Sequence, residues 1–477
     1  LTGAQALVRV PIVQARRDKK KNLNTACYIS GYRGSPLGGY DQQIIKNKKY
    51  LNENNIFFQP GINEELAATS LWGTQQVNLR KKDKYDGVFG IWYGKGPGVD
   101  RAGDALKHVN LAGTSKFGGV IALMGDDHIC ESSTTSHQSE FAMIDAMIPF
   151  FNPSGVQEIL DYGIIGIELS RKSGCWVGIK CVHDNVSSGA TVDLDENRVV
   201  LKDISEENYP SDGLNIRLKD TAQEKEYRLH HHKLKYIKEY CKLNNLNKLI
   251  FDSEKPKIGI ISTGKSFLDT KLGLEKIGIN KEVANDIGIK FLKIAMPWPL
   301  EETVIEKFAE NLDKIIVVEE KRSIIETQVK EILFNKNLKV KVIGKKDENS
   351  NDLFVSSGAL DPGEIGLKVY EIIKYLQLPD DVNNCSKELK SLTESTNSNI
   401  SLKRVPHFCS GCPHNTSTRI PEGSRAITGI SCAYLVEHME RDNEGFSQMG
   451  SEGATWVGES VFSNTDHVFQ NMGDGTY

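Results

Sequence analysis

The chain has 477 residues, enough for about two to four domains with large buried cores. Its formal net charge of −4 gives no indication of a nucleic-acid partner. Hydrophobic residues make up 39% of the chain, and no apolar run approaches the roughly 20 residues that a membrane-spanning helix needs. No secretory signal opens the sequence, and its nine cysteines, six of them scattered, fit a reducing compartment better than a disulfide framework. We therefore expect a soluble cytoplasmic protein with neither a membrane nor a nucleic-acid partner.

Residues 1–202 alternate short apolar runs with glycine-rich turns and amphipathic stretches. The apolar runs are rich in β-branched and aromatic residues, and they read NTACYISGY, YDGVFGIWY, GGVIALMG and GCWVGIKCV. This alternation predicts the α/β class with a doubly wound parallel sheet. In such a sheet, the loops at the carboxyl ends of the strands form the binding site.

Two features of this region are candidates for binding or catalysis. The loop SGYRGSPLGG (30–39) follows the first apolar run, and its glycines and Ser35 could contact a ligand. A tight strand-to-helix turn would have the same composition. Glu64 and Glu65 follow Asn63 at the predicted start of a helix, where acidic side chains favour the helix dipole. Helix capping alone would therefore explain both glutamates.

The middle of the chain contains a connector and a second α/β unit. Residues 203–250 are charged and helical, and the consecutive histidines 230–232 would point in different directions on a helix, so they cannot chelate one ion. Residues 251–375 again alternate strands and helices, and 376–400 read as a polar linker. The string GIISTGKS (259–266) satisfies the P-loop pattern. Its first glycine lies inside an apolar run, which leaves too short a loop to encircle phosphates.

Residues 401–477 hold the most distinctive chemistry. Cys409 and Cys412 form a C-x-x-C pair, and Cys432 follows about twenty residues later. Such thiolates suit zinc, an iron–sulfur cluster or a redox disulfide, and their spacing leaves these alternatives open. A second close pair for structural zinc is missing. Three thiolates are also one short of the usual set of about four for a cluster.

A glycine turn ends the sequence. Gly473, Asp474 and Gly475 follow the apolar string HVFQNM, which predicts a short strand and a tight turn. Such triplets usually mark turns only. An aspartate in this position can also face a hard cation such as Mg²⁺, while the flanking glycines let a diphosphate approach the backbone.

Taken together, these strings resemble the 2-oxoacid:ferredoxin oxidoreductases, and most closely the long fused indolepyruvate ferredoxin oxidoreductases of bacteria. The resemblance covers essentially the whole chain. It rests on TGAQALVR, SGYRGSPLGG, QPGINEELAAT, YGKGPGVDRAGD, GDDHICESSTTSHQSE, IPFFNPSGVQE, VVEEKRSIIETQVKEIL, CSGCPHNTST and MGDGTY, in that order.

The resemblance implies a fold of the thiamine diphosphate-binding, transketolase-like type. Residues 1–202 would be the pyrimidine-binding domain and 251–375 a transketolase C-terminal-like domain, joined by the connector 203–250. After the linker 376–400, residues 401–477 would begin the diphosphate-binding domain. Leu1 in place of Met, together with the absence of a downstream Mg-ligating Asn, suggests a fragment of a longer chain.

The resemblance also assigns roles to the candidate residues. Glu64, rather than Glu65, falls where the thiamine-activating glutamate lies, and Ser35 borders the substrate. The three cysteines, Cys409, Cys412 and Cys432, would bind a 4Fe-4S cluster. Asp474 would bind Mg²⁺, with Gly473 and Gly475 beside the diphosphate of thiamine diphosphate.

The implied reaction is the oxidative decarboxylation of an aryl 2-oxo acid, such as indolepyruvate, to its acyl-CoA. Coenzyme A would capture the acyl group, the electrons would pass through the cluster to ferredoxin, and the enzyme would be a homodimer. Two alternatives remain open from the residues. One is a non-oxidative thiamine diphosphate-dependent decarboxylase or synthase, which needs no cluster. The other is a zinc-stabilised binding module with a degenerate thiamine site.

Overall fold

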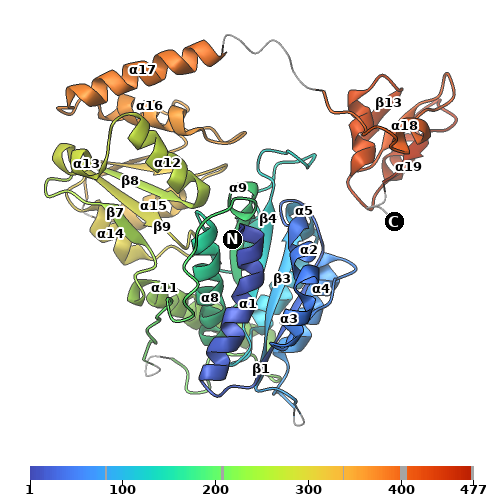
Figure 1. The fold of residues 1–477 in the computed structure, drawn as a ribbon, viewed down its shortest axis with the longest axis horizontal. Coiled ribbons are helices and arrows are strands. Elements are labelled where there is room, and N and C mark those ends of the chain that lie inside the picture. The colour runs from blue at the N-terminus through green and yellow to red at the C-terminus, as the bar shows by residue number, and fades with distance from the viewer. Residues whose placement is uncertain (81–82, 206–208, 337, 398–404, 474–477) are drawn as a thin grey trace. The chain divides into compact units, whose positions relative to one another are not determined.

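The structure, a computed structural model, describes residues 1–80, 83–205, 209–336, 338–397 and 405–473 (Figure 1). The chain forms two compact units, Leu1–Thr393 and Glu394–Tyr477. The first unit contains two α/β sheets, and the second contains one small sheet.

The first sheet has six parallel strands in the order β2-β1-β3-β4-β6-β5. The strands are β1 (Thr25–Gly31), β2 (Ile56–Phe58), β3 (Gly87–Lys95), β4 (Val120–Asp126), β5 (Phe150–Phe151) and β6 (Val177–Val182). The four longer strands coincide with the four apolar runs of the sequence. The predicted α/β class with a parallel sheet is thus confirmed.

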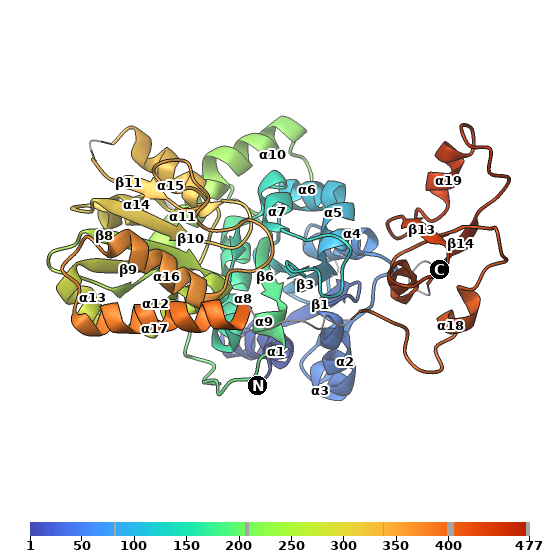
Figure 2. The ribbon, with the colours of Figure 1, turned by 90° about the horizontal axis from the view of Figure 1, so that it is seen from above.

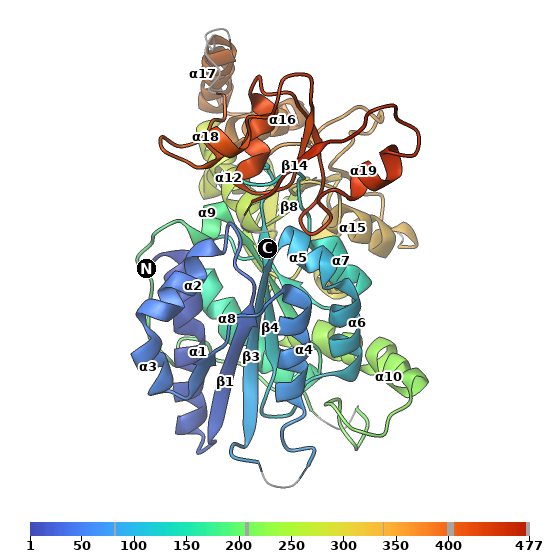
Figure 3. The ribbon, with the colours of Figure 1, turned by 90° about the vertical axis from the view of Figure 1, so that its right-hand side faces the viewer.

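Helices cover both faces of this sheet (Figure 3). One face carries α1 (Gly3–Lys20), α2 (Gly38–Lys46), α3 (Lys48–Asn52), α8 (Val156–Ser173) and α9 (His183–Val186). The other carries α4 (Glu64–Gln75), α5 (Gly96–Arg101), α6 (Gly103–Ala112) and α7 (Glu140–Asp145). Because both faces are buried, the strands are apolar along their whole length rather than alternating.

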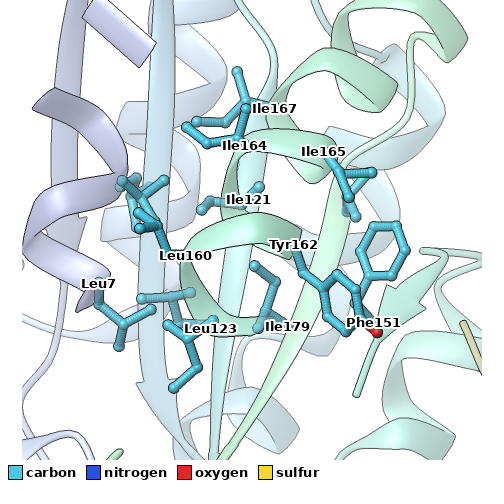
Figure 4. Close-up of a cluster of buried hydrophobic side chains, with 14 of the residues drawn as sticks. Leu7, Ile121, Leu123, Phe151, Leu160, Tyr162, Ile164, Ile165, Ile167 and Ile179 are labelled. Carbon is cyan, nitrogen blue, oxygen red and sulfur yellow. The ribbon is translucent and has the colours of Figure 1, made fainter. Parts of the chain in front are cut away.

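The core on the α1 and α8 face shows how the helices are held. Leu160 and Ile164 of α8 pack toward Ile121 and Ile179 of the sheet, and all four side chains are at most 5% exposed (Figure 4). Burial of such side chains stabilises each by about 1.5–3 kcal/mol. These contacts hold α8 against β4 and β6, in the same sheet as the strands β1 and β3.

A helical segment leads to the second sheet. It comprises α10 (Ala222–Arg228), a π-helical turn (Leu229–Lys233) and α11 (Leu234–Leu243). The strand order is β11-β10-β8-β9-β7, with only β7 antiparallel among the described strands. These strands are β7 (Lys248–Phe251), β8 (Ile258–Thr263), β9 (Ile289–Ile294), β10 (Lys314–Val318) and β11 (Lys341–Ile343).

The helices of the second sheet also divide between its two faces (Figure 2). One face packs against α12 (Gly264–Lys276), α13 (Lys281–Ile287) and α16 (Pro362–Ile373). The opposite face packs against α14 (Glu302–Ala309) and α15 (Ile325–Phe334).

The P-loop-like string adopts no phosphate-binding loop. Strand β8 passes directly into α12, so Gly259 lies within the strand, as inferred from the sequence. The Lys265 ammonium group pairs with Asp269 at 2.5 Å and Glu320 at 3.3 Å. Its charge is therefore already neutralised within the protein.

The segment expected to be a polar linker contains a long helix, α17 (Asp380–Asn397). Val382 of this helix is fully buried in the core that α16 shares with the second sheet. The few apolar residues of the segment lie on one side of the helix, and its polar composition obscured that pattern. The predicted domain boundaries remain a prediction.

The second unit contains a small parallel sheet in the order β13-β12-β14. Its elements are α18 (His414–Ser417), β12 (Ala426–Thr428), a 3₁₀ helix (Cys432–His438), β13 (Asn443–Phe446), α19 (Ala454–Glu459) and β14 (Phe469–Asn471). Throughout the described part of the chain, no helix is both long and apolar enough to cross a bilayer.

Candidate active site

The topology of the first sheet makes the carboxyl ends of β1 and β3 the expected place for a ligand. The chain goes from β1 to β2 on one side and then crosses to β3 on the other side of β1. In doubly wound sheets, ligands bind outside the carboxyl edge at such a switch point. Three segments meet there, namely the loop after β1, the start of α4 and the end of β3.

Glu64 is the first residue of α4, and its backbone is held at two points. The Asn63 side chain caps the helix by accepting a hydrogen bond of 2.8 Å from the Leu66 amide. The indole nitrogen of the buried Trp92 donates a hydrogen bond of 2.9 Å to the Glu64 carbonyl oxygen. Glu64 therefore has a fixed position beside the end of β3.

Two glycines form a cradle for the Glu64 carboxyl group. A Cβ atom added at Gly98 would collide with Glu64 Oε1, and one added at Gly94 would lie 3.1 Å from Glu64 Cγ. A side chain at either position would compete for the space that Glu64 occupies. The glycines of the string YGKGPG therefore leave free the space that the Glu64 carboxyl group occupies.

The surroundings of Glu64 change its acidity. Partial burial raises the pKa of Glu64, while its own backbone amide and the charge of Arg101 oppose the rise. The neighbouring Glu65 side chain is exposed, whereas Glu64 is half-buried. The helix therefore directs only the first of the two glutamates toward the end of the sheet. The catalytic role of Glu64 stays a prediction.

Ser35 lies at the same edge, exposed on the loop that follows β1. This loop contacts the end of β3, because a Cβ atom on Gly34 would lie 2.8 Å from Lys95 Cβ. It also contacts the segment before α4 through a hydrogen bond of 2.9 Å from the Gly61 amide to the Gly31 carbonyl. The structure therefore brings the Ser35 loop and Glu64 to one edge, and the substrate contact itself remains a prediction.

The loop after β4 is held by its own side chains. Asp127 accepts hydrogen bonds from the amides of Glu131 and Ser132 and from the Ser133 hydroxyl, at 2.8–3.0 Å. His137 packs against Gly96, where a side chain would collide with its ring, and burial lowers the pKa of His137. Burial also lowers the pKa of His128. The side chains of both histidines are thus buried in the protein, and burial favours their neutral form.

Sequence reasoning did not single out two further polar groups near Glu64, the side chains of Lys95 and Tyr93. Lys95 ends β3, and its ammonium group donates to the Ser132 carbonyl at 2.7 Å. Tyr93, two residues earlier, is fully buried, and the nearby charges of Asp41 and Glu64 contribute to raising its pKa. The available signal was their position at the end of an apolar run.

The cysteines of the second unit are not gathered into a metal site. Cys409 and Cys412 lie in one turn, closed by a hydrogen bond of 3.1 Å from the Cys412 amide to the Cys409 carbonyl, and Cys432 begins the 3₁₀ helix. Within the described residues, no three His, Cys, Asp or Glu side chains are close enough to hold a metal ion. The convergence that an iron–sulfur site requires is therefore not observed, and the cluster assignment stays a prediction.

The glycine turn is described only at its first residue. Gly473 follows β14 and packs against Ser431, so that a Cβ atom there would collide with the Ser431 hydroxyl. Ser431 directly precedes Cys432, and the turn therefore begins beside the third cysteine. Asp474 and Gly475 lie outside the described residues.

Three comparisons relate the chain to known proteins. Residues 248–397 match the family model described as the indolepyruvate oxidoreductase domain. The whole chain is 24% identical to the indolepyruvate oxidoreductase subunit IorA of Methanothermobacter marburgensis, of which it spans 70%. Over 76% of its length it is 25% identical to the IorA subunit of Pyrococcus abyssi, of which it spans 51%.

A solved structure shares the fold. The 2-oxoglutarate:ferredoxin oxidoreductase from Magnetococcus marinus, with 2-oxoglutarate, coenzyme A and succinyl-CoA bound, aligns with a TM-score of 0.56 at 12% identity. The alignment covers 78% of this chain and 65% of that one. The resemblance indicated by the sequence motifs and the predicted fold class are both confirmed.

Proposed function

We propose that this chain, a homologue of the indolepyruvate oxidoreductases, contributes the residues that activate thiamine in a 2-oxo acid oxidoreductase. These residues would lie at the carboxyl edge of its first sheet. The reaction would be the oxidative decarboxylation of an aryl 2-oxo acid to its acyl-CoA. The chain spans between about half and 70% of the two relatives compared above. The proposal therefore concerns the complete enzyme that carries these residues.

One observation carries the proposal, the Glu64 carboxyl group in its glycine cradle. A half-buried carboxyl group with a raised pKa can exchange a proton at neutral pH more readily than an exposed one. It lies at the switch point of a parallel sheet, where open α/β sheets bind their ligands. Ordinary helix capping does not explain the cradle, because the cap of α4 is Asn63.

The residues around Glu64 fit the pyrimidine end of thiamine diphosphate. Bound thiamine diphosphate supplies the carbon nucleophile that 2-oxo acid decarboxylation needs. The Glu64 carboxyl group would hold and transfer the proton at a ring nitrogen of the pyrimidine. Trp92 and Asn63 would keep the carboxyl group in place through the backbone of α4. Gly94 and Gly98 leave room for the Glu64 carboxyl group.

The remaining cofactors are assigned to the second unit by resemblance. We propose Asp474 as a ligand of Mg²⁺, with Gly473 and Gly475 beside the diphosphate. We also propose Cys409, Cys412 and Cys432 as ligands of a 4Fe-4S cluster, through which electrons would pass to ferredoxin. Among the described residues, these thiols are not close enough together to hold a metal ion, so no step of the reaction is derived through the cluster.

The proposed setting is a homodimer in the cytoplasm that uses coenzyme A as its acyl acceptor. All nine cysteines are free, which supports a reducing compartment. The solved relative with coenzyme A and succinyl-CoA bound supports the acyl acceptor through its shared fold.

Glu64→Gln in the full-length enzyme tests the proposal. Glutamine keeps the shape and a hydrogen bond but cannot take up the proton, so turnover of indolepyruvate should fall by about 10²–10⁴-fold. Thiamine diphosphate content and iron content should stay close to wild type. The matched control is Glu65→Gln, because Glu65 is exposed on the same helical turn. If Glu65→Gln abolishes turnover while Glu64→Gln lowers it only a few-fold, the assignment is wrong by one residue.

A further inference from the structure

The second sheet contacts the loop after β4 through one pair of residues. Gln138 of that loop binds Arg322, which lies between β10 and α15 and 184 residues further along the chain. The Gln138 side-chain nitrogen donates to the Arg322 carbonyl oxygen at 3.0 Å, and its oxygen accepts from Arg322 N and Nε, both at 3.1 Å. The Arg322 guanidinium carbon also lies 3.9 Å from the ring centroid of Phe141. The Gln138 side chain is therefore fixed on a segment of the second sheet.

The turn that carries Arg322 is itself firmly held. Glu319, directly after β10, is buried, and its carboxylate accepts three hydrogen bonds of 2.9–3.0 Å from the backbone amides of residues 324–326. These bonds close the turn around Arg322 onto the first residues of α15. Gln138 is thus bound to a part of the backbone that has little freedom to move.

The residue before Gln138 reaches the glycines that surround Glu64. His137 packs against Gly96, where an added Cβ atom would lie 2.2 Å from His137 Cγ. His137 Nε2 also lies 3.8 Å from Asp100 Oδ2. Gly96 and Asp100 belong to α5, and Gly98 of the same helix borders the Glu64 carboxyl group. The imidazole ring therefore lies against the helix that leaves space for that carboxyl group.

Three consecutive residues of the loop thus contact three different elements. His137 contacts α5, Gln138 binds the turn before α15, and the Ser139 amide donates to the Asp126 carboxylate at the end of β4 at 2.9 Å. Because the three residues share one short stretch of backbone, the release of Gln138 would allow His137 to move away from α5. The alternative is that Gln138 only stabilises the fold, which would lower the amount of folded enzyme but not the turnover of each folded molecule.

We propose that Gln138 is a positioning residue, which through its contact with Arg322 keeps His137 against α5 and so keeps the Glu64 carboxyl group in place. This inference rests on the proposed function. The second sheet would then help to set the geometry of the site at the carboxyl edge of the first sheet.

The first test measures turnover of indolepyruvate by Gln138→Ala in the full-length enzyme. Loss of all three hydrogen bonds should lower kcat by about 10- to 100-fold, because small displacements of a catalytic group are costly. KM should change much less, since Glu64 is proposed to transfer a proton rather than to hold the substrate. Gln138→Glu keeps the oxygen that accepts from Arg322 and should lie between Gln138→Ala and wild type. The control is Glu131→Ala, at an exposed position of the same loop, which should leave kcat unchanged.

Amide hydrogen exchange followed by mass spectrometry supplies a readout that depends on neither turnover nor bound cofactor. In the cofactor-free full-length protein, peptides that contain α5 should exchange several-fold faster in Gln138→Ala than in wild type, because local opening exposes their amides. Peptides from α1, on the opposite face of the sheet, should exchange at the wild-type rate and so show that the variant is folded. Glu131→Ala should match wild type in both regions.

The outcomes separate this inference from the proposed function. An unchanged kcat in Gln138→Ala, or a lowered kcat with unchanged exchange in α5, would overturn the positioning role of Gln138 and leave the role of Glu64 intact. Wild-type turnover in Glu64→Gln would overturn the proposed function. Faster exchange in α5 would then show only that Gln138 holds that helix.

Discussion

Two regions carry the proposed chemistry, and they differ in how their groups are held. The Glu64 edge comprises Glu64, Lys95 and the two cradle glycines Gly94 and Gly98, at the end of the first sheet. The cysteine region comprises residues 405–440 of the second unit. At the Glu64 edge, strands and a capped helix fix each group through backbone hydrogen bonds and a buried core. In the cysteine region, Cys409 and Cys432 are exposed and not gathered around a common point.

The difference follows from what each kind of site requires. A carboxyl group that exchanges a proton needs a fixed position and partial burial, both of which the polypeptide supplies by folding. Thiolates repel one another when ionised, and a metal supplies much of the free energy that brings them together. We therefore expect the Glu64 edge to exist without its cofactor and the cysteine region to depend on metal for its final arrangement.

The largest effect should come from the cysteine region. Cys432→Ser in the anaerobically purified full-length enzyme removes one of the three proposed ligands, and a cluster needs about four. Ferredoxin-linked turnover should be lost, and iron content should fall well below wild type. Cys385→Ser, at a half-buried free cysteine of α17, is the control and should alter neither. Full iron content and turnover in Cys432→Ser would remove this cysteine from the proposed site.

A smaller effect should come from the cradle of the Glu64 edge. Gly98→Ala introduces a methyl group where Glu64 Oε1 lies, so the carboxyl group must move. Displacements of about 1 Å can cost about 10²-fold in rate, and turnover should fall by that factor. Gly103→Ala, at a glycine with open space around it, should leave turnover unchanged. Equal turnover in the two variants would show that the position of Glu64 is not critical.

The smallest effect concerns a buried charge at the end of β4, next to this edge. Burial raises the pKa of Asp126 to about 6, opposed by Lys180 and by hydrogen bonds from Ser139. The folded state therefore binds this proton more tightly than the unfolded chain. The resulting stabilisation is fully present below about pH 4 and is lost as the pH rises through about 6.

Asp126→Asn should remove that pH dependence. Between pH 4 and 7, the unfolding free energy of the first unit should fall by about 2 kcal/mol more in wild type than in the variant. Urea titrations at several pH values measure this difference. Asp466→Asn, at an exposed position of the second unit, should retain the wild-type slope. An identical slope in Asp126→Asn would mean that Asp126 is not the group that titrates.

The sequence alone determined the architecture of the first unit to a large extent. Strands buried on both faces must be apolar throughout, so the long strands of both sheets stood out as apolar runs. The strands β2 and β5, of three and two residues, and the edge strand β7 were not predicted. Segments this short carry too few residues for a periodic pattern.

The candidate site was predictable in its residue types but not in its geometry. Asn63, Glu64 and Glu65 form an ordinary helix start in the sequence, and either glutamate satisfies the helix dipole. Only the packing of α4 against the end of β3, with Trp92 bound to the Glu64 carbonyl and Gly98 beside its carboxyl group, makes the two glutamates different.

The sequence and the tertiary structure thus answer different questions about this protein. The sequence determined which residues could cap, bind or ligate, because those properties belong to single side chains and their near neighbours. The tertiary structure decided which of them share one place. The Gly31–Gly61 and Gly34–Lys95 contacts join segments about 30 to 60 residues apart, and the sheet topology brings them to one edge. Such contacts cannot be predicted from the spacing of residues in the sequence, because the strand order of a doubly wound sheet differs from the order along the chain.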